Sequence, residues 1–334
     1  MLHNYHITIK SIGLGLVLFF FACGGDSNNA NSNLGNEPAN PNTPSAPAMV
    51  TTPDFNADSA YEFVVKQVSF GPRVPNSAGH ILCGNWLIDK FKTYGAKVTV
   101  QEATLRLFDG SPVKARNIIA AYKPALANRI ILSAHWDTRP IADQDDERTG
   151  DPIDGANDGG SGVAVLLELA RLFHAQSPTI GVDIILWDAE DNGRPNIENS
   201  YCLGSQHWAR NKHAANYQAR YGINLDMVGA ANATFLKEGV SMGMASGVVQ
   251  KVWSTGQRLG YGQYFSNQRV GAIVDDHVYM NDPGAVKSID IIDMKPEGGF
   301  FGAWHTHDDN IDVISRETLK AVGQTVAEVV YQEK

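Results

Sequence analysis

The segment VDIILWDAEDNG, residues 182–193, joins a run of apolar residues directly to three acids. Residues 184–187 are all apolar, which is typical of a strand buried on both faces of a sheet. The three acids that follow are Asp188, Glu190 and Asp191. Like charges at one place raise each other's pKa values unless a cation compensates them. The segment therefore predicts a central strand that carries carboxylates to a functional site.

Strand and helix patterns alternate on both sides of this segment. Further strands are predicted at residues 96–105, 128–138, 221–229 and 286–293. Helical periodicity is found at residues 80–95, 163–175, 204–213 and 315–332. Alternating strands and helices favour an α/β fold with a parallel sheet. We therefore predict a single domain over residues 53–334, with a mixed, mostly parallel central sheet flanked by helices.

Composition and charge exclude two broad classes of protein. The 334 residues are 43% hydrophobic and 19% charged, so the chain can bury a substantial core and is not disordered as a whole. The formal net charge is −9. Nucleic-acid-binding domains carry basic surfaces, so nucleic acid is not expected as a partner.

The N-terminus has the features of an export signal. Lys10 precedes the apolar run SIGLGLVLFFFA, residues 11–22, which is too short to span a bilayer as a helix. The run ends at FFAC, which resembles a bacterial lipobox with Cys23 as the lipidated residue. We predict a signal peptide of the lipoprotein type over residues 1–22. A plain secretory signal that is cleaved nearby is the alternative.

Residues 23–52 are rich in Asn, Pro, Ser, Ala and Gly, and they predict a flexible tether. A tether that follows a lipidated cysteine would hold an enzyme at a membrane without inserting it. We therefore expect an exported protein that is lipid-anchored to a bacterial membrane, on the periplasmic or cell-surface side. The membrane is expected as a partner only through this anchor.

Two cysteines remain if Cys23 carries lipid, namely Cys83 and Cys202. Exported chains meet an oxidising compartment, in which disulfides form and persist. The sequence is compatible with a Cys83–Cys202 bridge and equally with two buried thiols.

Chemically useful side chains follow several of the predicted strands. His135 and Asp137 follow one strand, Asp226 ends another, and Asp158 begins a glycine-rich turn that leads into a helix. Ligand sites of α/β sheets lie beyond the carboxyl ends of the strands, so these side chains should meet at one edge. Zinc is commonly bound by His nitrogen and carboxylate oxygen, with one position left open in catalytic sites. The pattern predicts a metal site at that edge.

The ordered motifs resemble those of the animal-type and bacterial glutaminyl cyclases. The segments that carry this resemblance are SAHWDT, NDGGSGVAVLLELAR, LWDAED, YCLGSQHWA, NLDMVG, DDH and WHTHDDN. These glutaminyl-peptide cyclotransferases share their fold with zinc aminopeptidases. The resemblance extends from about residue 70 to the C-terminal helix. It implies a zinc aminopeptidase-like fold.

The resemblance also implies a set of functional residues. One zinc ion per chain would be bound by Asp158, Asp191 and His305, where Asp191 stands in place of the Glu of the animal enzymes. Glu190 falls at the position of the general acid/base. Neighbouring side chains at a strand end point in different directions, so one acid can bind metal while the other carries a proton.

Further residues match the family's substrate pocket. Asp226 and Asp275 match acids that position the reacting groups, and Trp304 and Phe300 match aromatic residues of the pocket. A second pocket tryptophan of the animal enzymes has no counterpart after the acidic pair, so a different residue must cover the substrate. His135 retains the aminopeptidase pattern, in which this histidine binds a second zinc.

The implied activity is the cyclisation of an N-terminal glutamine of peptides or proteins to pyroglutamate, with release of ammonia. This reaction is that of an acyltransferase of the aminoacyltransferase type, and we expect the protein to act as a monomer. The alternative enzyme is a di-zinc aminopeptidase that uses His135 and Asp226 as ligands of a second metal. The alternative without catalysis is a metal-stabilised surface receptor or adhesion module.

Overall fold

The computed structural model describes residues 51–334, which belong to one compact unit. The predicted signal peptide, Cys23 and the predicted tether up to residue 50 lie outside the described residues. The last two residues assigned to the tether contact the folded chain. Thr51 O accepts a hydrogen bond from Gln176 Nε2 at 2.9 Å, and Thr52 Oγ1 donates to Glu328 Oε2 at 2.5 Å.

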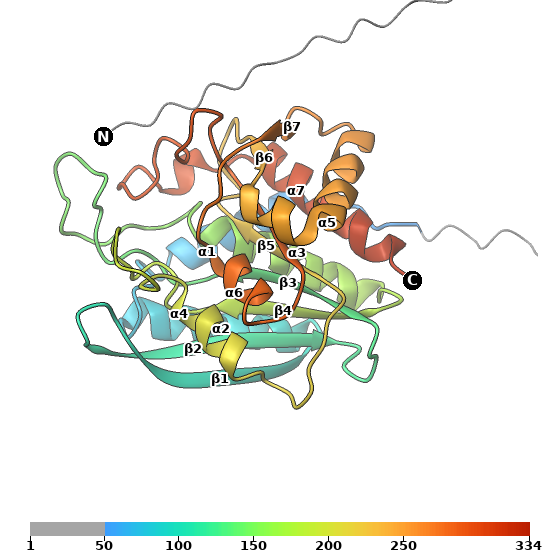
Figure 1. Cartoon of the computed structure of the whole chain (residues 1–334), viewed down its shortest axis with the longest axis horizontal. Coiled ribbons are helices and arrows are strands. Elements are labelled where there is room, and N and C mark those ends of the chain that lie inside the picture. Colours follow the sequence, from blue (N-terminus) through green and yellow to red (C-terminus); the bar gives the residue numbers. More distant parts are fainter. Residues whose placement is uncertain (1–50) are drawn as a thin grey trace, which may run out of the picture. The chain divides into compact units, whose positions relative to one another are not determined.

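A six-stranded mixed sheet forms the centre of the fold (Figure 1). Its strand order is β1-β2-β4-β3-β5-β8. The four strands from β4 to β8 are parallel to one another, whereas β1 and β2 are antiparallel to their neighbours. The strands are β1 (Lys97–Arg106), β2 (Pro112–Tyr122), β3 (Arg129–His135), β4 (Gly181–Trp187), β5 (Gly222–Asp226) and β8 (Ser288–Ile292). The predicted fold class is therefore confirmed.

Helices cover both faces of this sheet. One face carries α1 (Ala57–Val68), α2 (Ala78–Thr93), α3 (Gly160–Ala175), α5 (Gly239–Arg258) and α7 (Arg316–Gln332). The other face carries α4 (Leu203–Arg210) and α6 (Asp276–Asn281), which lie side by side (Figure 1). A small parallel pair, β6 (Phe235–Lys237) and β7 (Phe265–Arg269), and the 3₁₀ turn η1 (Ile311–Val313) complete the fold. None of the helices within residues 51–334 is long and apolar enough to cross a membrane.

The strand β4 is buried along its whole length, as its apolar sequence predicts. Successive side chains of a strand point to opposite faces of the sheet. Ile184 and Leu186 accordingly pack in the core below α3 and α7, whereas Ile185 and Trp187 pack in a second core below α4 and α6. Burial on both faces holds the end of β4, and the acids that follow it, in a fixed place.

The two cysteines belong to these two different cores. Cys83 of α2 packs with the first, and Cys202, which precedes α4, packs with the second. Both are buried free thiols. The sheet separates them, so the bridge considered from the sequence is wrong and the alternative of two buried thiols is correct.

The order of the parallel strands places the site. The chain runs from β3 through α3 to β4 on one side of β3, and later continues in β5 on the other side. Where strand order reverses in this way, the loops leave the carboxyl ends of the strands in opposite directions and open a crevice. The ends of β4, β3 and β5 therefore form the floor of a potential site.

Candidate active site

The three side chains expected to bind zinc lie together in the structure. Asp158, Asp191 and His305 each place one donor atom within 4.8 Å of the others, and all three are buried. The Nε2 atom of His305 lies 3.3 Å from Asp191 Oδ1 and 3.7 Å from Asp158 Oδ2. Asp158 and His305, which are 147 positions apart in the chain, are thus neighbours, as the family resemblance implies.

The loop that carries Asp158 is fixed by its neighbours. Asp309 accepts hydrogen bonds from the backbone N–H groups of Asn157 at 2.8 Å and Asp158 at 3.0 Å. Gly159 follows with φ of +79°, and a Cβ atom there would lie 2.9 Å from the ring of His135. Both its conformation and the close approach of the ring require glycine at this position.

His305 is held from two sides. The indole of Trp304 stacks on its ring, with 3.7 Å between centroids and 24° between planes. Its Nδ1 atom lies 3.0 Å from Asp143 Oδ1. Burial lowers the pKa of His305, but Asp191 and Asp143 outweigh this effect and raise it to about 9. A carboxylate on the far nitrogen is the usual partner of a metal-binding histidine, because it orients the ring.

Arg139 connects the acids around this point. Its guanidinium donates to Asp143 at 2.9 and 2.6 Å, and to Asp191 Oδ1 at 3.2 Å. The side chain of Arg139 is buried, so its positive charge acts directly on both carboxylates. Arg139 and Asp143 could not be recognised from the sequence, because they lie in a polar loop and belong to no motif.

The donor set fits a zinc ion. Oδ2 of Asp158 and Oδ2 of Asp191 are buried and accept no hydrogen bond from any residue of the described chain, 51–334. Buried carboxylate oxygens are rarely left without a partner, so each such atom requires an explanation. Two carboxylates and one histidine form a zinc donor set that leaves a fourth position open. A bound cation would satisfy both oxygens.

Glu190 lies beside these donors and lines the adjoining pocket. The carboxylate of Asp137 fixes the backbone of Glu190. It accepts hydrogen bonds from the backbone N–H groups of Glu190 at 3.0 Å and Asp191 at 3.2 Å. Burial raises the pKa of Glu190 well above its usual value; His135 opposes this rise and Asp191 reinforces it. A raised pKa makes a carboxylate a stronger proton acceptor, which suits a general acid/base.

Asp226 and Asp275 line the same pocket. Asp226 ends β5, and burial raises its pKa to about 7 although the nearby His135 opposes the rise. Asp275 precedes α6 and accepts a hydrogen bond from Asn224 Nδ2 at 2.9 Å. His135 Nε2 lies 3.0 Å from Asp158 and 3.2 Å from Asp226, so these three also form a group that could hold a metal.

The pocket has a volume of about 250 Å³ and apolar walls around its acidic base. Trp304 and Phe300 line it, with 4.8 Å between their ring centroids, in agreement with the expectation for both. Tyr201 lines the side that follows the acidic pair, where the second tryptophan is missing. Its ring packs so closely on Gly193 that a Cβ atom there would lie 2.4 Å from it. Tyr201 is thus the aromatic residue that covers this side.

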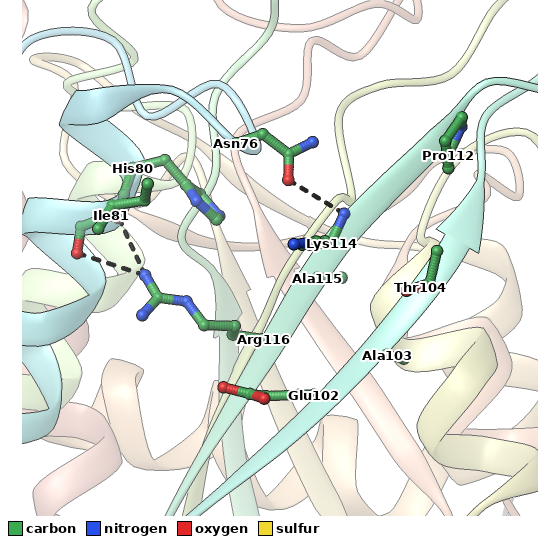
Figure 2. Close-up of a pocket in the computed structure, with 10 residues that line it drawn as sticks. All are labelled: Asn76, His80, Ile81, Glu102, Ala103, Thr104, Pro112, Lys114, Ala115 and Arg116. Carbon is green, nitrogen blue, oxygen red and sulfur yellow. Dashed lines mark hydrogen bonds between the residues drawn. The ribbon is translucent and has the colours of Figure 1, made fainter.

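A larger hollow, of about 1030 Å³, lies between α2 and the β1–β2 hairpin (Figure 2). None of the residues predicted to act in catalysis lines it. Two of the polar side chains that line it, Asn76 and Arg116, form local hydrogen bonds. Asn76 Oδ1 accepts from the backbone N–H of Lys114 at 3.1 Å, and Arg116 donates to the backbone oxygens of His80 and Ile81 (Figure 2). These contacts join α2 to β2.

Asp188, the first acid of the opening segment, serves the same junction. Its carboxylate lies 2.9 Å from Nε2 of His80 in α2 and accepts from the backbone N–H of Arg116 in β2 at 2.6 Å. It is fully buried and does not line the catalytic pocket. The three acids after β4 therefore have different places, and only Glu190 and Asp191 reach the site.

Comparisons with known proteins agree with this geometry. The model of peptidase family M28 matches residues 117–330. The solved glutaminyl cyclase of Bacteroides thetaiotaomicron, bound to N-acetylhistamine, is 53% identical with a TM-score of 0.84, over 85% of this chain and 100% of that chain. A Zn-dependent exopeptidase from Parabacteroides distasonis is 52% identical with a TM-score of 0.83, over the same shares.

A curated aminopeptidase from Bacillus subtilis is 28% identical over 272 residues, which are 79% of this chain. The chain spans about half of that protein's length, 54%. The family match covers β2 to α7 and contains Asp158, Glu190, Asp191 and His305. On this evidence the chain belongs to peptidase family M28.

Proposed function

We propose that this protein is a glutaminyl-peptide cyclotransferase, an aminoacyltransferase that converts an N-terminal glutamine of peptides or proteins to pyroglutamate and releases ammonia. One observation carries the proposal. The Glu190 carboxylate lies beside the Asp158, Asp191 and His305 donors at the base of a small pocket with an aromatic wall. A proton carrier and a cation site therefore face the same substrate-sized space. The high identity to solved glutaminyl cyclases supports this choice.

Asp158, Asp191 and His305 would hold one zinc ion per chain. Such an ion would supply Lewis-acid polarisation of the substrate's γ-carbonyl group and stabilisation of the negative charge on its oxygen. The second group of donors supports a single ion less well. The first group contains both carboxylates that have an orphaned oxygen, Asp158 and Asp191, whereas the second group contains only one of them, Asp158.

Glu190 carries the proton in this reaction. It takes a proton from the α-amino nitrogen as that nitrogen forms a bond to the γ-carbonyl carbon. It then gives the proton to the amide nitrogen, whose bond to the same carbon breaks as ammonia leaves. Asp226 and Asp275 line the same pocket, in which carboxylates attract and orient the amino group.

The pocket walls contribute by restricting the shape of the substrate. The glutamine side chain must fold back so that its amide carbon lies about 3 to 3.5 Å from the amino nitrogen. Trp304, Phe300 and Tyr201 give a space of about 250 Å³ that fits one side chain of this size. Because the nucleophile belongs to the substrate itself, the reaction needs no water molecule at the site.

The second candidate is an aminopeptidase that releases N-terminal residues. The group formed by His135, Asp158 and Asp226 favours it, because that group could hold a second cation. Asp158 belongs to both groups. Cations held by these residues would activate water for hydrolysis of the peptide bond, and Glu190 would act as the base for that water.

The product formed from a glutamine-initiated peptide distinguishes the two reactions. We expect the peptide to keep all its residues and to lose one ammonia, as measured by mass spectrometry together with an ammonia assay. The same peptide with an N-terminal alanine should stay unchanged, because it has no γ-carbonyl group. A peptide shortened by one residue, from either substrate, would support the aminopeptidase and contradict the cyclase.

We also propose that the enzyme is exported and anchored to a bacterial membrane through lipid on Cys23. The apolar run before Ala22-Cys23 and the polar residues after it support this location. With a radioactive fatty acid supplied to the producing bacterium, the wild-type protein should become labelled and the Cys23→Ser variant should not. Equal label in both proteins, or label in neither, would contradict the anchor.

A further inference from the structure

Cys202, which precedes α4, forms two hydrogen bonds with Glu190. The backbone N–H of Cys202 donates to the backbone oxygen of Glu190 at 2.9 Å. Its Sγ atom donates to Glu190 Oε1 at 3.1 Å. Within residues 51–334 this thiol is the only group that forms a hydrogen bond with the Glu190 carboxylate. The other carboxylate oxygen, Oε2, forms no hydrogen bond within the described residues. The Glu190 side chain lines the pocket.

The surroundings fix the thiol in place. Cys202 is fully buried and has φ of +57°, a left-handed conformation that costs free energy for a residue other than glycine. Three backbone hydrogen bonds hold this conformation: from Cys202 to Glu190, from Leu203 to Ala189 at 3.1 Å, and from Gln206 to Cys202 at 3.0 Å. The chain segment after β4 and the start of α4 therefore form one rigid unit.

The thiol acts as a hydrogen-bond donor at this place. Burial raises the pKa of Cys202 well above its usual value, and the neighbouring Glu190 raises it further. The sulfur therefore keeps its proton, and it does not line the catalytic pocket, so it is no nucleophile for a substrate. A weak S–H donor orients a carboxylate and still leaves it basic enough to accept a proton.

We propose that Cys202 is a positioning residue, whose thiol holds Oε1 of Glu190 so that Oε2 faces the substrate's amino group. This role rests on the proposed cyclase function. The sequence indicates for Cys202 only a disulfide or a buried thiol, and neither interpretation predicts a contact with Glu190.

Two substitutions at this position test the role by kinetics. Ala and Ser have the same left-handed strain as Cys, but only Ser keeps a donor. We expect Cys202→Ala to lower kcat by about tenfold with an unchanged KM, since a hydrogen bond to a charged group is lost while the pocket is not. Cys202→Ser should recover most of kcat. The control is Cys83→Ala, which removes a buried thiol remote from Glu190 and should leave both parameters unchanged.

Two kinetic outcomes would overturn the proposal. One is a Cys202→Ala variant with the kcat of the wild type. The other is an equal loss of kcat in Cys202→Ala and Cys202→Ser, which would show that packing of the sulfur, rather than its donor, is what matters.

The infrared S–H stretching band tests the contact without any substrate. The Cys202 band is the one that disappears in Cys202→Ser, and it should lie at lower frequency than the Cys83 band. Removal of the acceptor in Glu190→Ala should move it to higher frequency, and an unmoved band would overturn the proposal. If the wild type cyclises no peptide, the proposed function fails, and this band still decides whether Cys202 binds Glu190.

Discussion

Replacement of Glu190 by Gln is expected to lower kcat for cyclisation of a glutamine-initiated peptide by about a thousandfold, since positioned acid/base groups contribute about 10²- to 10⁴-fold. Gln has the shape of Glu but accepts no proton from the amino group. The carboxylates and the histidine of the zinc site remain, so the zinc content should not change. Steady-state ammonia release and metal analysis of the same preparation measure both quantities.

The matched control is Glu198→Gln, which makes the same change at an exposed acid in the loop that follows the acidic pair. Its kcat and KM should equal those of the wild type, because Glu198 does not line the pocket. A Glu190→Gln variant with undiminished cyclisation would remove Glu190 from its role. A variant that loses zinc as well would show that the carboxylate acts on the metal site.

Replacement of Asp158 by Asn is expected to remove zinc and, with it, activity. The buried Oδ2 atom of Asp158 accepts no hydrogen bond within residues 51–334, as suits a cation ligand, and an amide keeps the shape of the side chain without its charge. Turnover should fall by at least about a hundredfold, since Lewis-acid stabilisation is worth several kcal/mol. The exposed Asp308 lies in the same motif as His305, and Asp308→Asn is the control that should retain both metal and activity.

Native mass spectrometry of the same proteins counts the metal directly. The wild type should carry one zinc per chain and Asp158→Asn none. Two tightly bound zinc ions in the wild type would mean that the His135 group is also occupied, as in the aminopeptidase alternative. Full zinc content in Asp158→Asn would exclude Asp158 as an essential ligand.

The strands of the parallel sheet were predictable because their short apolar runs are typical of buried strands. The apolar run of β4 was expected at residues 182–188 and is found at Gly181–Trp187. Less regular segments were not assigned. In β2, Lys114, Arg116 and Asn117 interrupt the apolar pattern, and the glycines of α5 have low helix propensity, so that only tertiary packing stabilises this helix.

The helix α3 begins three residues before its predicted start, because packing against the sheet outweighs the local preference of glycine for turns. The sequence placed it at Val163, after three glycines that usually indicate a turn, whereas the helix begins at Gly160. The glycines are required by packing. A Cβ atom at Gly162 would lie 2.3 Å from the backbone oxygen of Leu225 in β5, so this turn of α3 lies directly against the sheet.

The residues that line the candidate site could be predicted from sequence motifs, whereas the residues that hold them in place could not. Asp158, Asp191 and His305 lie in ordered motifs, whereas Asp143 lies in a loop and meets His305 across 162 positions of sequence. Loop conformation depends on contacts that no local pattern encodes. Cys202 was likewise hidden, because its role depends on a left-handed backbone conformation that also has no motif.

Four residues other than glycine have this left-handed conformation next to the functional side chains. They are Ala189 before Glu190, Cys202, Met227 after Asp226, and His305. Such conformations persist only where the surrounding structure enforces them, and they concentrate at functional sites. Rigid backbone around the acids agrees with a reaction in which a flexible glutamine side chain must be folded against its own amino group.

Reaction in water labelled with heavy oxygen shows whether the attacking atom is the substrate's own amino nitrogen or the oxygen of water. The wild-type protein is incubated with a glutamine-initiated peptide in this water, and the product is analysed by mass spectrometry. The account predicts a pyroglutamyl peptide that contains no heavy oxygen. Heavy oxygen in a released amino acid, or in a glutamate formed from the glutamine, would show that water is the nucleophile and would contradict the account.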